Sequence, residues 1–199
     1  MKVLSLMARM GGTLTPDLSA RLPELFNRVY DAEHAIPLLT SGMNEAAFAP
    51  PPSAQVRRAK MEEWELGSRN SMQHDLVVHP SGVVYSVDMM QDKLYRLDPE
   101  TGERSAFVVP HGDLPPGGIF GGPNDPSPPN ANAHVGPHSL QVAPDGAVWT
   151  TLAWGNQIAR FDPVVAATSE VDAWKIHELE EGYYPHTLRF DDRGRIWYT

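Results

Sequence analysis

The chain has 199 residues, of which 41% are hydrophobic and 21% are charged, a composition typical of one sizeable globular domain or two small ones. Its formal net charge of -9 argues against non-specific binding to nucleic acid and against binding to an anionic membrane surface. The chain has no cysteine, which excludes disulfides, thiolate metal sites and a cysteine nucleophile.

The N-terminal sequence MKVLSLMARM starts with a lysine and a short apolar run that Arg9 interrupts. This run is shorter than the apolar stretch of a secretion signal, and nothing in the chain reaches the roughly 18 apolar residues of a membrane span. We therefore expect no membrane insertion and a cytoplasmic location for the chain as written. A periplasmic location is the alternative for a longer parent protein.

Residues 1–58 predict a short helical segment and a linker. Residues 15–17 (TPD) combine a capping hydroxyl, a proline at the first helical position and an acid in the first turn. A second helix start is expected at Pro23. The three prolines at 50–52 are typical of a stiff linker.

From residue 59 onward, short strands and tight turns replace the helical pattern. The first strand candidate is 62–66. Four more strands, joined by tight turns, predict one antiparallel meander; they are 75–79, 83–88, 93–98 and 103–109. A second meander follows, with strands at 139–143, 147–152, 157–162 and 171–179. A third unit begins at residue 187 and turns at DDRG, 191–194.

The units share one register. A histidine opens the first strand of each unit, a turn glycine follows eight residues later, and an aromatic residue follows three after that. The histidines are His74, His138 and His186. Between the first two units, about twenty residues rich in glycine and proline are inserted within 111–135, which predicts an irregular surface loop.

Four-stranded units repeating every 40–50 residues or so predict a β-propeller. The expected fold class is all-β: a partial β-propeller over 59–199, with about two and a half four-stranded blades of an expected seven, preceded by the short helical segment. Because a propeller needs about four to eight blades to close, we expect that the chain is truncated at its C-terminus. We also expect self-association through the open blade edges.

The segments HDLVVHPSGVVYSVDMMQDKLYRLDP (74–99) and PHSLQVAPDGAVWTTLAWGNQIARFDP (137–163) resemble the repeat of the virginiamycin B lyase (streptogramin lyase) family of seven-bladed propellers. The resemblance spans about residues 60–199. It implies an enzyme that opens a cyclic depsipeptide by elimination, with Mg²⁺. It also implies that catalysis uses a histidine at the start of a blade and a glutamate fourteen residues later.

Carried over position by position, the resemblance leaves the acid in doubt. His138 is present, but Leu152 stands at its acid position. His74 is followed by Asp88, a shorter carboxylate, and the acid position of His186 would fall one residue beyond Thr199. We therefore expect that residues 1–199, a possible carbon–oxygen lyase by resemblance, are inactive alone.

The candidate catalytic residues are therefore His186, His138, His74 and Asp88. A structural role stays open for each: the histidines can hydrogen-bond the backbone of the adjacent blade, and Asp88 can be a turn residue. Outside the register, His134 is expected near the channel mouth. Arg96 and Arg160 are expected to pair with neighbouring acids or to cover the sheet edge.

Two functions are open. The first is a lyase acting on a cyclic peptide or ester, with a channel histidine as the base and Mg²⁺ stabilising the developing charge. Mg²⁺ prefers oxygen ligands, so the histidines are expected to be bases, whereas three converging imidazoles would favour zinc, copper or iron. The second is a non-catalytic propeller that binds a small-molecule or cyclic peptide ligand or a protein partner, for example as the sensor module of a larger protein. The absent acid at Leu152 favours this second function. A related hydrolase or lactonase is a weaker third option, and no nucleic-acid partner is expected.

Overall fold

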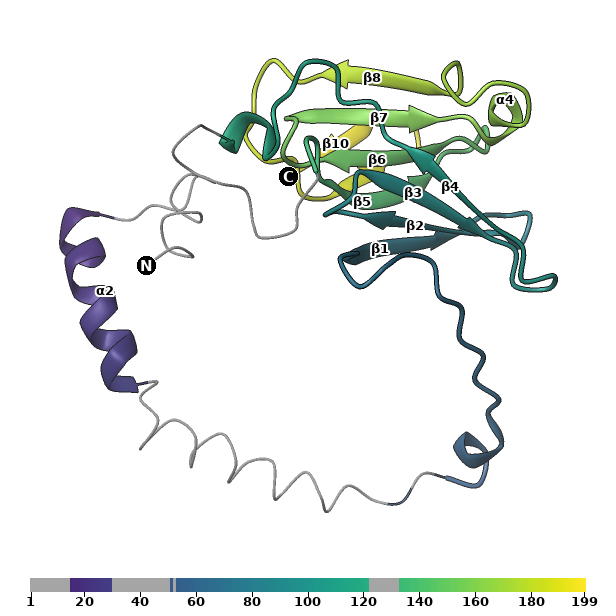
Figure 1. Cartoon of the computed structure of the whole chain (residues 1–199), viewed down its shortest axis with the longest axis horizontal. Coiled ribbons are helices and arrows are strands. Elements are labelled where there is room, and N and C mark those ends of the chain that lie inside the picture. The colour runs from purple at the N-terminus through teal and green to yellow at the C-terminus, as the bar shows by residue number, and fades with distance from the viewer. Residues whose placement is uncertain (1–14, 30–50, 52, 122–132) are drawn as a thin grey trace. The chain divides into compact units, whose positions relative to one another are not determined.

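The computed structural model describes residues 15–29, 51, 53–121 and 133–199 (Figure 1). The chain divides into two compact units, residues 1–63 and 64–199. In the first unit the structure describes one α-helix, α2 (Pro16–Val29), and one 3₁₀ turn, η1 (Val56–Arg58). None of the helices in these described ranges is both long enough and apolar enough to cross a membrane.

Helix α2 begins where the sequence predicts. The Thr15 hydroxyl accepts a hydrogen bond from the Leu18 backbone N–H at 3.2 Å, which satisfies one of the free donors of the first turn. One turn further on, Arg21 pairs with Asp17 at 3.2 Å. The second helix start expected at Pro23 is wrong, because α2 runs through that residue. A proline removes one helical hydrogen bond, but its fixed φ is compatible with a helix.

The described part of the second unit contains ten strands. Those of the first blade are β1 (Gln73–Val78), β2 (Val84–Asp88), β3 (Lys93–Leu97) and β4 (Arg104–Val108). Those of the second blade are β5 (Pro137–Val142), β6 (Val148–Leu152), β7 (Gln157–Phe161) and β8 (Trp174–Glu178). A short helix, α4 (Pro163–Ala166), lies between β7 and β8. The last hairpin is β9 (Leu188–Phe190) and β10 (Ile196–Tyr198).

Each blade is an antiparallel meander whose strands pair in sequence order. The turn glycines Gly82 and Gly146 join the first two strands of their blades with φ of 88° and 86°, a region that only glycine adopts at little cost. The first strands β1, β5 and β9 contact one another in succession, and the sheets fan out from them (Figure 1). The predicted fold is confirmed as a partial β-propeller preceded by a short helix.

An apolar core holds the first two blades together. Its buried members come from both sheets: Val83, Tyr85, Val87, Leu94, Leu140, Val148, Phe161 and Ala173. Phe161 contributes most visibly, because its ring lies 4.7 Å from that of Phe107 and 6.3 Å from that of Tyr85. Burying such rings is worth about 1.5–3 kcal/mol each, so the stacking of neighbouring blades stabilises the unit.

The strand expected at 62–66 is not formed. The Glu65 carbonyl instead accepts a hydrogen bond from the Arg104 guanidinium at 2.6 Å. The indole nitrogen of Trp64 lies 3.7 Å from the point where a Cβ on Gly102 would be, at the β3–β4 turn. The described chain offers no earlier strand with which this segment could pair, so its aromatic side chain covers a turn.

The insert between the first two blades was expected to be an irregular surface loop, but part of it is buried. Its first part contains a 3₁₀ turn, η2 (Gly118–Phe120), that is buried at both ends. The Ile119 N–H donates to the Trp154 carbonyl at 2.9 Å. A Cβ on Gly118 would lie 2.0 Å from that carbonyl oxygen, so this approach requires glycine. Residues 122–132 of the insert lie outside the described residues.

Asp92 fastens the end of the insert to the first blade. Its side chain is 3% exposed, and its carboxylate accepts hydrogen bonds from three successive backbone N–H groups. Those donors are His134 at 2.5 Å, Val135 at 3.2 Å and Gly136 at 2.9 Å. Burial raises the pKa of Asp92, and these hydrogen bonds lower it in part. The second blade thus starts at a position fixed by a carboxylate of the first.

We expect that Asp92→Asn lowers the free energy of unfolding by about 1–3 kcal/mol, because an amide can replace only part of the acceptor set and leaves backbone donors unpaired. Asparagine stands at the equivalent position of the second blade, Asn156, with a similar φ (52° against 48°), so the substitution adds no backbone strain. Urea unfolding measures the change. The control is Asp172→Asn at an exposed position. An equal effect of the two substitutions would contradict the anchoring role.

Candidate functional site

The structure brings the three repeat histidines into one row. His74 is in β1, His138 is in β5, and His186 lies just before β9. The ring centroids of His74 and His138 are 3.7 Å apart, and those of His138 and His186 are 4.1 Å apart. The row follows from the fold, because the first strands of successive blades lie side by side and each histidine holds the same place in its blade.

Each of the first two histidines is tied to the backbone of the next one. His74 Nδ1 lies 3.0 Å from the His138 carbonyl oxygen, and the His138 ring hydrogen-bonds the backbone of His186. An imidazole has two nitrogens, so one such bond leaves the other nitrogen unused by this contact. His186 differs, because its Nδ1 lies 3.0 Å from the Thr187 hydroxyl.

The middle histidine differs in its environment from its neighbours. His138 is 4% exposed, whereas His74 and His186 are exposed. Burial is the main cause that lowers the pKa of His138, and the charged forms of His74 and His186 lower it as well. The hydrogen bond with the His186 backbone and the nearby Asp75 oppose this shift, and the resulting pKa is about 4. His138 is therefore uncharged at neutral pH.

The acid positions do not supply a partner to the row. Asp88 is fully buried, and its Oδ1 accepts hydrogen bonds from the backbone N–H groups of Met72 at 3.0 Å and Met90 at 3.1 Å. Its Oδ2 is buried without a hydrogen-bond partner. Leu152 is also fully buried. Asp88 thus holds the chain on either side of it, as a turn residue does, and no hydrogen bond among the described residues joins it to His74.

A carboxylate that sequence reasoning missed lies beside the row. Asp75 follows His74, and its Oδ2 accepts a hydrogen bond from the Leu140 N–H at 2.9 Å, which ties β1 to β5. Its Oδ1 accepts from the Leu76 N–H at 2.9 Å. The pairing of β1 with β2 is irregular between Gln73 and Asp75, which accounts for an inward-facing acid that strand alternation alone does not predict.

Aromatic side chains close in on the row, and these too were missed. The Tyr184 ring lies 5.8 Å from that of His138 and 6.1 Å from that of His186. The Phe120 ring, from the insert, lies 5.8 Å from that of Tyr184. The pair YY at 183–184, two residues before His186, and the aromatic residue in the insert were the available signals. The row therefore combines imidazoles with apolar ring surface, the usual composition of a ligand site.

His134 does not join this row. Its ring stacks on that of His111, with centroids 3.9 Å apart and an interplanar angle of 15°. Its Nδ1 lies 2.6 Å from the Leu114 carbonyl oxygen. The expectation that His134 lies at the channel mouth finds no support in these contacts, because they hold the insert together.

The side chains around the row do not fit Mg²⁺. Among the described residues, no group of three or more histidine, aspartate or glutamate side chains is arranged to hold a metal ion. Mg²⁺ prefers oxygen ligands, whereas the row offers nitrogens, and three of the four oxygens of Asp75 and Asp88 already accept backbone hydrogen bonds. The Mg²⁺ expectation stays a prediction from the family resemblance.

We expect that the folded chain loses stability in acid through His138. In the unfolded chain this histidine has its ordinary pKa of 6.5, whereas in the folded chain it becomes protonated only near pH 4. The contribution to stability is therefore full above pH 6.5 and is lost as the pH falls from 6.5 to about 4. The loss is about 2–3 kcal/mol. In His138→Gln, an amide can still donate a hydrogen bond, and this part of the pH dependence should vanish. Unfolding measured at pH 7 and pH 4 tests it; equal acid sensitivity of both proteins would contradict the assignment.

No protein-family model matches the chain, and no curated protein matches it. Solved structures with a similar fold exist. One is a virginiamycin B lyase from Staphylococcus aureus, solved as a catalytically inactive histidine-to-alanine variant with quinupristin. It has a TM-score of 0.53 and 20% sequence identity, and the match covers 71% of this chain and 39% of that one.

Another is a streptogramin B lyase structure, with a TM-score of 0.50 and 23% identity, where the match covers 70% of this chain and 37% of that one. The chain spans about two fifths of the length of these neighbours. At these identities the likeness concerns the fold alone: this chain is a partial β-propeller similar to part of the propeller of these lyases.

Proposed function

We propose that the histidine row binds a cyclic peptide or ester and that His186 is the base in an elimination that opens the ring. The observation that carries this proposal is the accessibility of His186. It is exposed beside the buried and uncharged His138, and its Nδ1 contacts the Thr187 hydroxyl, so Nε2 is left to face a ligand. The other two histidines each use a ring nitrogen on the backbone of a neighbouring blade.

In such an elimination, the base takes a proton from the carbon next to a carbonyl group. The electron pair of that C–H bond forms a C=C bond, the C–O bond of the ester breaks, and the carboxylate leaves with the bonding pair. A neutral imidazole suits this step at neutral pH. The fold likeness to two lyases, one of them solved as an inactive histidine-to-alanine variant with quinupristin, supports the same choice of reaction.

A second candidate function is ligand binding without catalysis. Two observations favour it: the position fourteen residues after His138 holds the buried Leu152, and Asp88 is occupied with backbone N–H groups. Both candidates use the same row, and they differ only in whether a bound ring is opened.

We expect that residues 1–199 alone bind quinupristin without opening it, because the acid position of His186 falls after Thr199. A chain that also includes that acid position is expected to convert quinupristin into a linear isomer of the same mass, because elimination adds no atoms. Liquid chromatography with mass detection distinguishes three outcomes. An isomer of equal mass indicates elimination, a product heavier by one water indicates hydrolysis, and unchanged quinupristin indicates that no reaction occurs. Calorimetry measures binding in parallel.

We expect that, in this longer chain, His186→Ala lowers turnover by about 100-fold or more while binding changes by only a few fold, because a general base acts in the transition state. Thr187→Val, which removes the hydroxyl beside Nδ1, should have a smaller effect in the same direction. His79→Ala, in the turn that follows β1 and at the end of that strand away from the row, is the control and should leave turnover unchanged. Binding by this longer chain without conversion would favour the second candidate, and absence of binding would reject both.

A further inference from the structure

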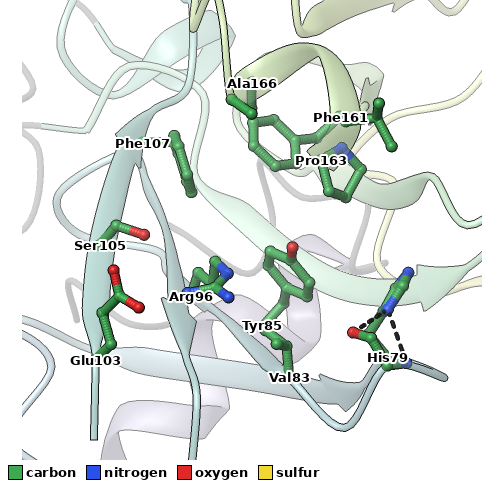
Figure 2. A pocket seen from close by; sticks show the side chains of 13 residues that line it. His79, Val83, Tyr85, Arg96, Glu103, Ser105, Phe107, Phe161, Pro163 and Ala166 are labelled. Atoms are coloured by element: carbon green, nitrogen blue, oxygen red, sulfur yellow. Dashed lines mark hydrogen bonds between the residues drawn. The ribbon is translucent and has the colours of Figure 1, made fainter. Parts of the chain in front are cut away.

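A cavity separate from the histidine row lies between the first two blades, at the opposite end of the strands. It has a volume of about 470 Å³ and is lined by residues of β2, β3 and β4 on one side and of β7 and α4 on the other (Figure 2). His79 and Ser81, at the turn that follows β1, also line it. A volume of this order suits a small organic molecule.

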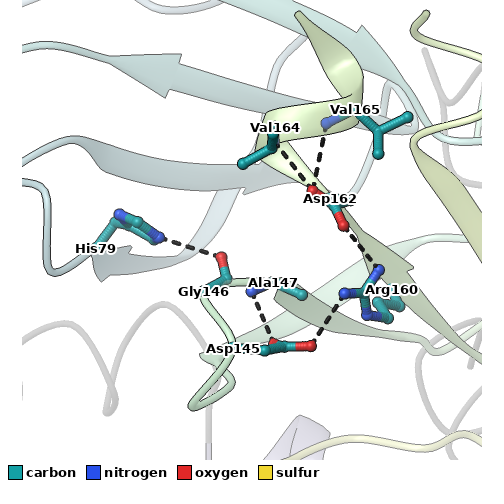
Figure 3. Close-up of polar contacts among 8 residues, drawn as sticks. All are labelled: His79, Asp145, Gly146, Ala147, Arg160, Asp162, Val164 and Val165. Atoms are coloured by element: carbon teal, nitrogen blue, oxygen red, sulfur yellow. Dashed lines mark hydrogen bonds and ion pairs between the residues drawn. The ribbon is translucent and has the colours of Figure 1, made fainter.

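The most informative residue of this cavity is Arg96, and the second blade supplies its comparison. The equivalent Arg160 is neutralised by two acids: it pairs with Asp145 at 3.0 Å and with Asp162 at 3.2 Å (Figure 3). The hydrogen bond with Asp145 is the main cause that raises the pKa of Arg160. The pKa of Asp145 is lowered first by the Ala147 N–H and then by Arg160. Burial raises the pKa of Asp162, but the N–H groups of Val165 and Val164, together with Arg160, bring it below its ordinary value. The expectation that Arg160 pairs with neighbouring acids is therefore confirmed.

Within the described ranges, Arg96 has no such ion pair. One equivalent position differs, and the acid at the other is present and accepts backbone hydrogen bonds, as Asp162 does. Where the second blade has Asp145 in the turn PDG, the first has Ser81 in the turn PSG. Where the second has Asp162, the first has Asp98, whose Oδ1 accepts hydrogen bonds from the N–H groups of Glu100 at 3.0 Å and Thr101 at 3.2 Å. In the described part of the chain, no ion pair joins Arg96 to an acid.

The Arg96 guanidinium is thus a half-buried cation that faces a cavity. It lies opposite Tyr85 across the β2–β3 pair, close enough to the phenol to offset part of the rise in the Tyr85 pKa that burial causes. The Ser81 hydroxyl does not replace an acid, because it lies 2.7 Å from His79 Nδ1. The His79 Nε2 is used as well, at 3.1 Å from the Gly146 carbonyl oxygen.

The rest of the cavity wall is apolar. Phe107 and Phe161 pack ring to ring at 4.7 Å, and Pro163 and Ala166 lie beside them (Figure 2). Glu103 lies at the rim and is exposed. A guanidinium next to an aromatic wall fits a ligand with a carboxylate at one end and an apolar group at the other, and a negatively charged rim disfavours a second anionic group.

We propose that this cavity is a binding site for small organic monocarboxylates that carry an apolar or aromatic group. The carboxylate pairs with the Arg96 guanidinium, in the place that Asp145 takes for Arg160, and the apolar group lies on Phe107 and Phe161. The site is separate from the histidine row and does not rest on the function proposed for it.

The test uses phenylacetate as the probe and phenylacetamide, its neutral analogue of similar shape, as the matched ligand control. NMR titration of the purified chain should show saturable binding of phenylacetate, with amide shifts confined to the first two blades. Phenylacetamide should bind at least about tenfold more weakly, because a charge-assisted bidentate pair is lost.

Two variants place the effect on Arg96. Ser81→Asp gives the first blade the acid of the second, so Arg96 acquires an internal partner and phenylacetate should bind at least about tenfold more weakly. Ser81→Asn is the neutral control of similar size and should bind as the wild type does. Arg96→Gln should also weaken binding by at least about tenfold, while Arg160→Gln should leave it unchanged.

Circular dichroism establishes that each variant is folded, and the comparison of the two ligands on the wild type needs no variant at all. The proposal is overturned if phenylacetate shows no saturable binding up to about 10 mM, a limit set by weak millimolar affinity. It is also overturned if phenylacetamide binds equally well, or if folded Ser81→Asp and Arg96→Gln bind phenylacetate as tightly as the wild type.

Discussion

Hydrogen bonds from the side chains of one blade to the backbone of the next determine where the first strands lie. Asp75 of β1 accepts from the Leu140 N–H, and His74 Nδ1 lies 3.0 Å from the His138 carbonyl oxygen. Further along, the Thr151 hydroxyl accepts from the Ser139 N–H and donates to the His186 carbonyl. The apolar core brings neighbouring sheets together without fixing their relative height, since burial of apolar surface is non-directional. The polar contacts fix that height.

This arrangement has a chemical consequence at the histidine row. Three imidazoles held about 4 Å apart cannot all carry a charge without strong repulsion, and the middle one is also buried. The depressed pKa of His138 follows from its place in the row. The backbone bond of one ring nitrogen orients the ring of His74 and of His138, and burial together with the neighbouring imidazoles keeps His138 uncharged at neutral pH.

The sequence predicted the propeller well because its strands are short, its turns contain glycine and its register repeats. His74, Gly82 and Tyr85 recur in the second blade at one common offset, and a common offset places equivalent residues at equivalent positions of the fold. The same argument placed the three histidines at the starts of adjacent strands. This argument failed at residues 62–66 (EEWEL). The segment has no partner strand among the described residues, and Trp64 covers a turn instead.

The parts of the site that sequence reasoning missed depend on contacts between segments far apart in the chain. Asp92 accepts backbone hydrogen bonds from residues more than forty positions later, and Phe120 reaches the row from within the insert. Tyr184 holds a positive φ of 66°, an unusual backbone conformation that places its ring against His138. The sequence shows only that Tyr184 belongs to a tyrosine pair and that Phe120 is an aromatic residue of the insert, and neither fact identifies the contact that it makes.

The two complete blades also show how a repeat permits different functions at equivalent positions. The backbone of the first turn is the same in both blades, since Gly82 and Gly146 have nearly the same φ. The residue before the glycine differs between the blades, Ser81 in the first and Asp145 in the second. In the second blade Asp145 caps the Ala147 N–H and pairs with Arg160, which closes that end of the blade electrostatically. In the first blade the Ser81 hydroxyl lies 2.7 Å from His79 Nδ1, and Arg96 lines the cavity. The two blades thus differ at one turn position, Ser81 against Asp145, and among the described residues only the arginine of the second blade forms ion pairs with acids of its own blade.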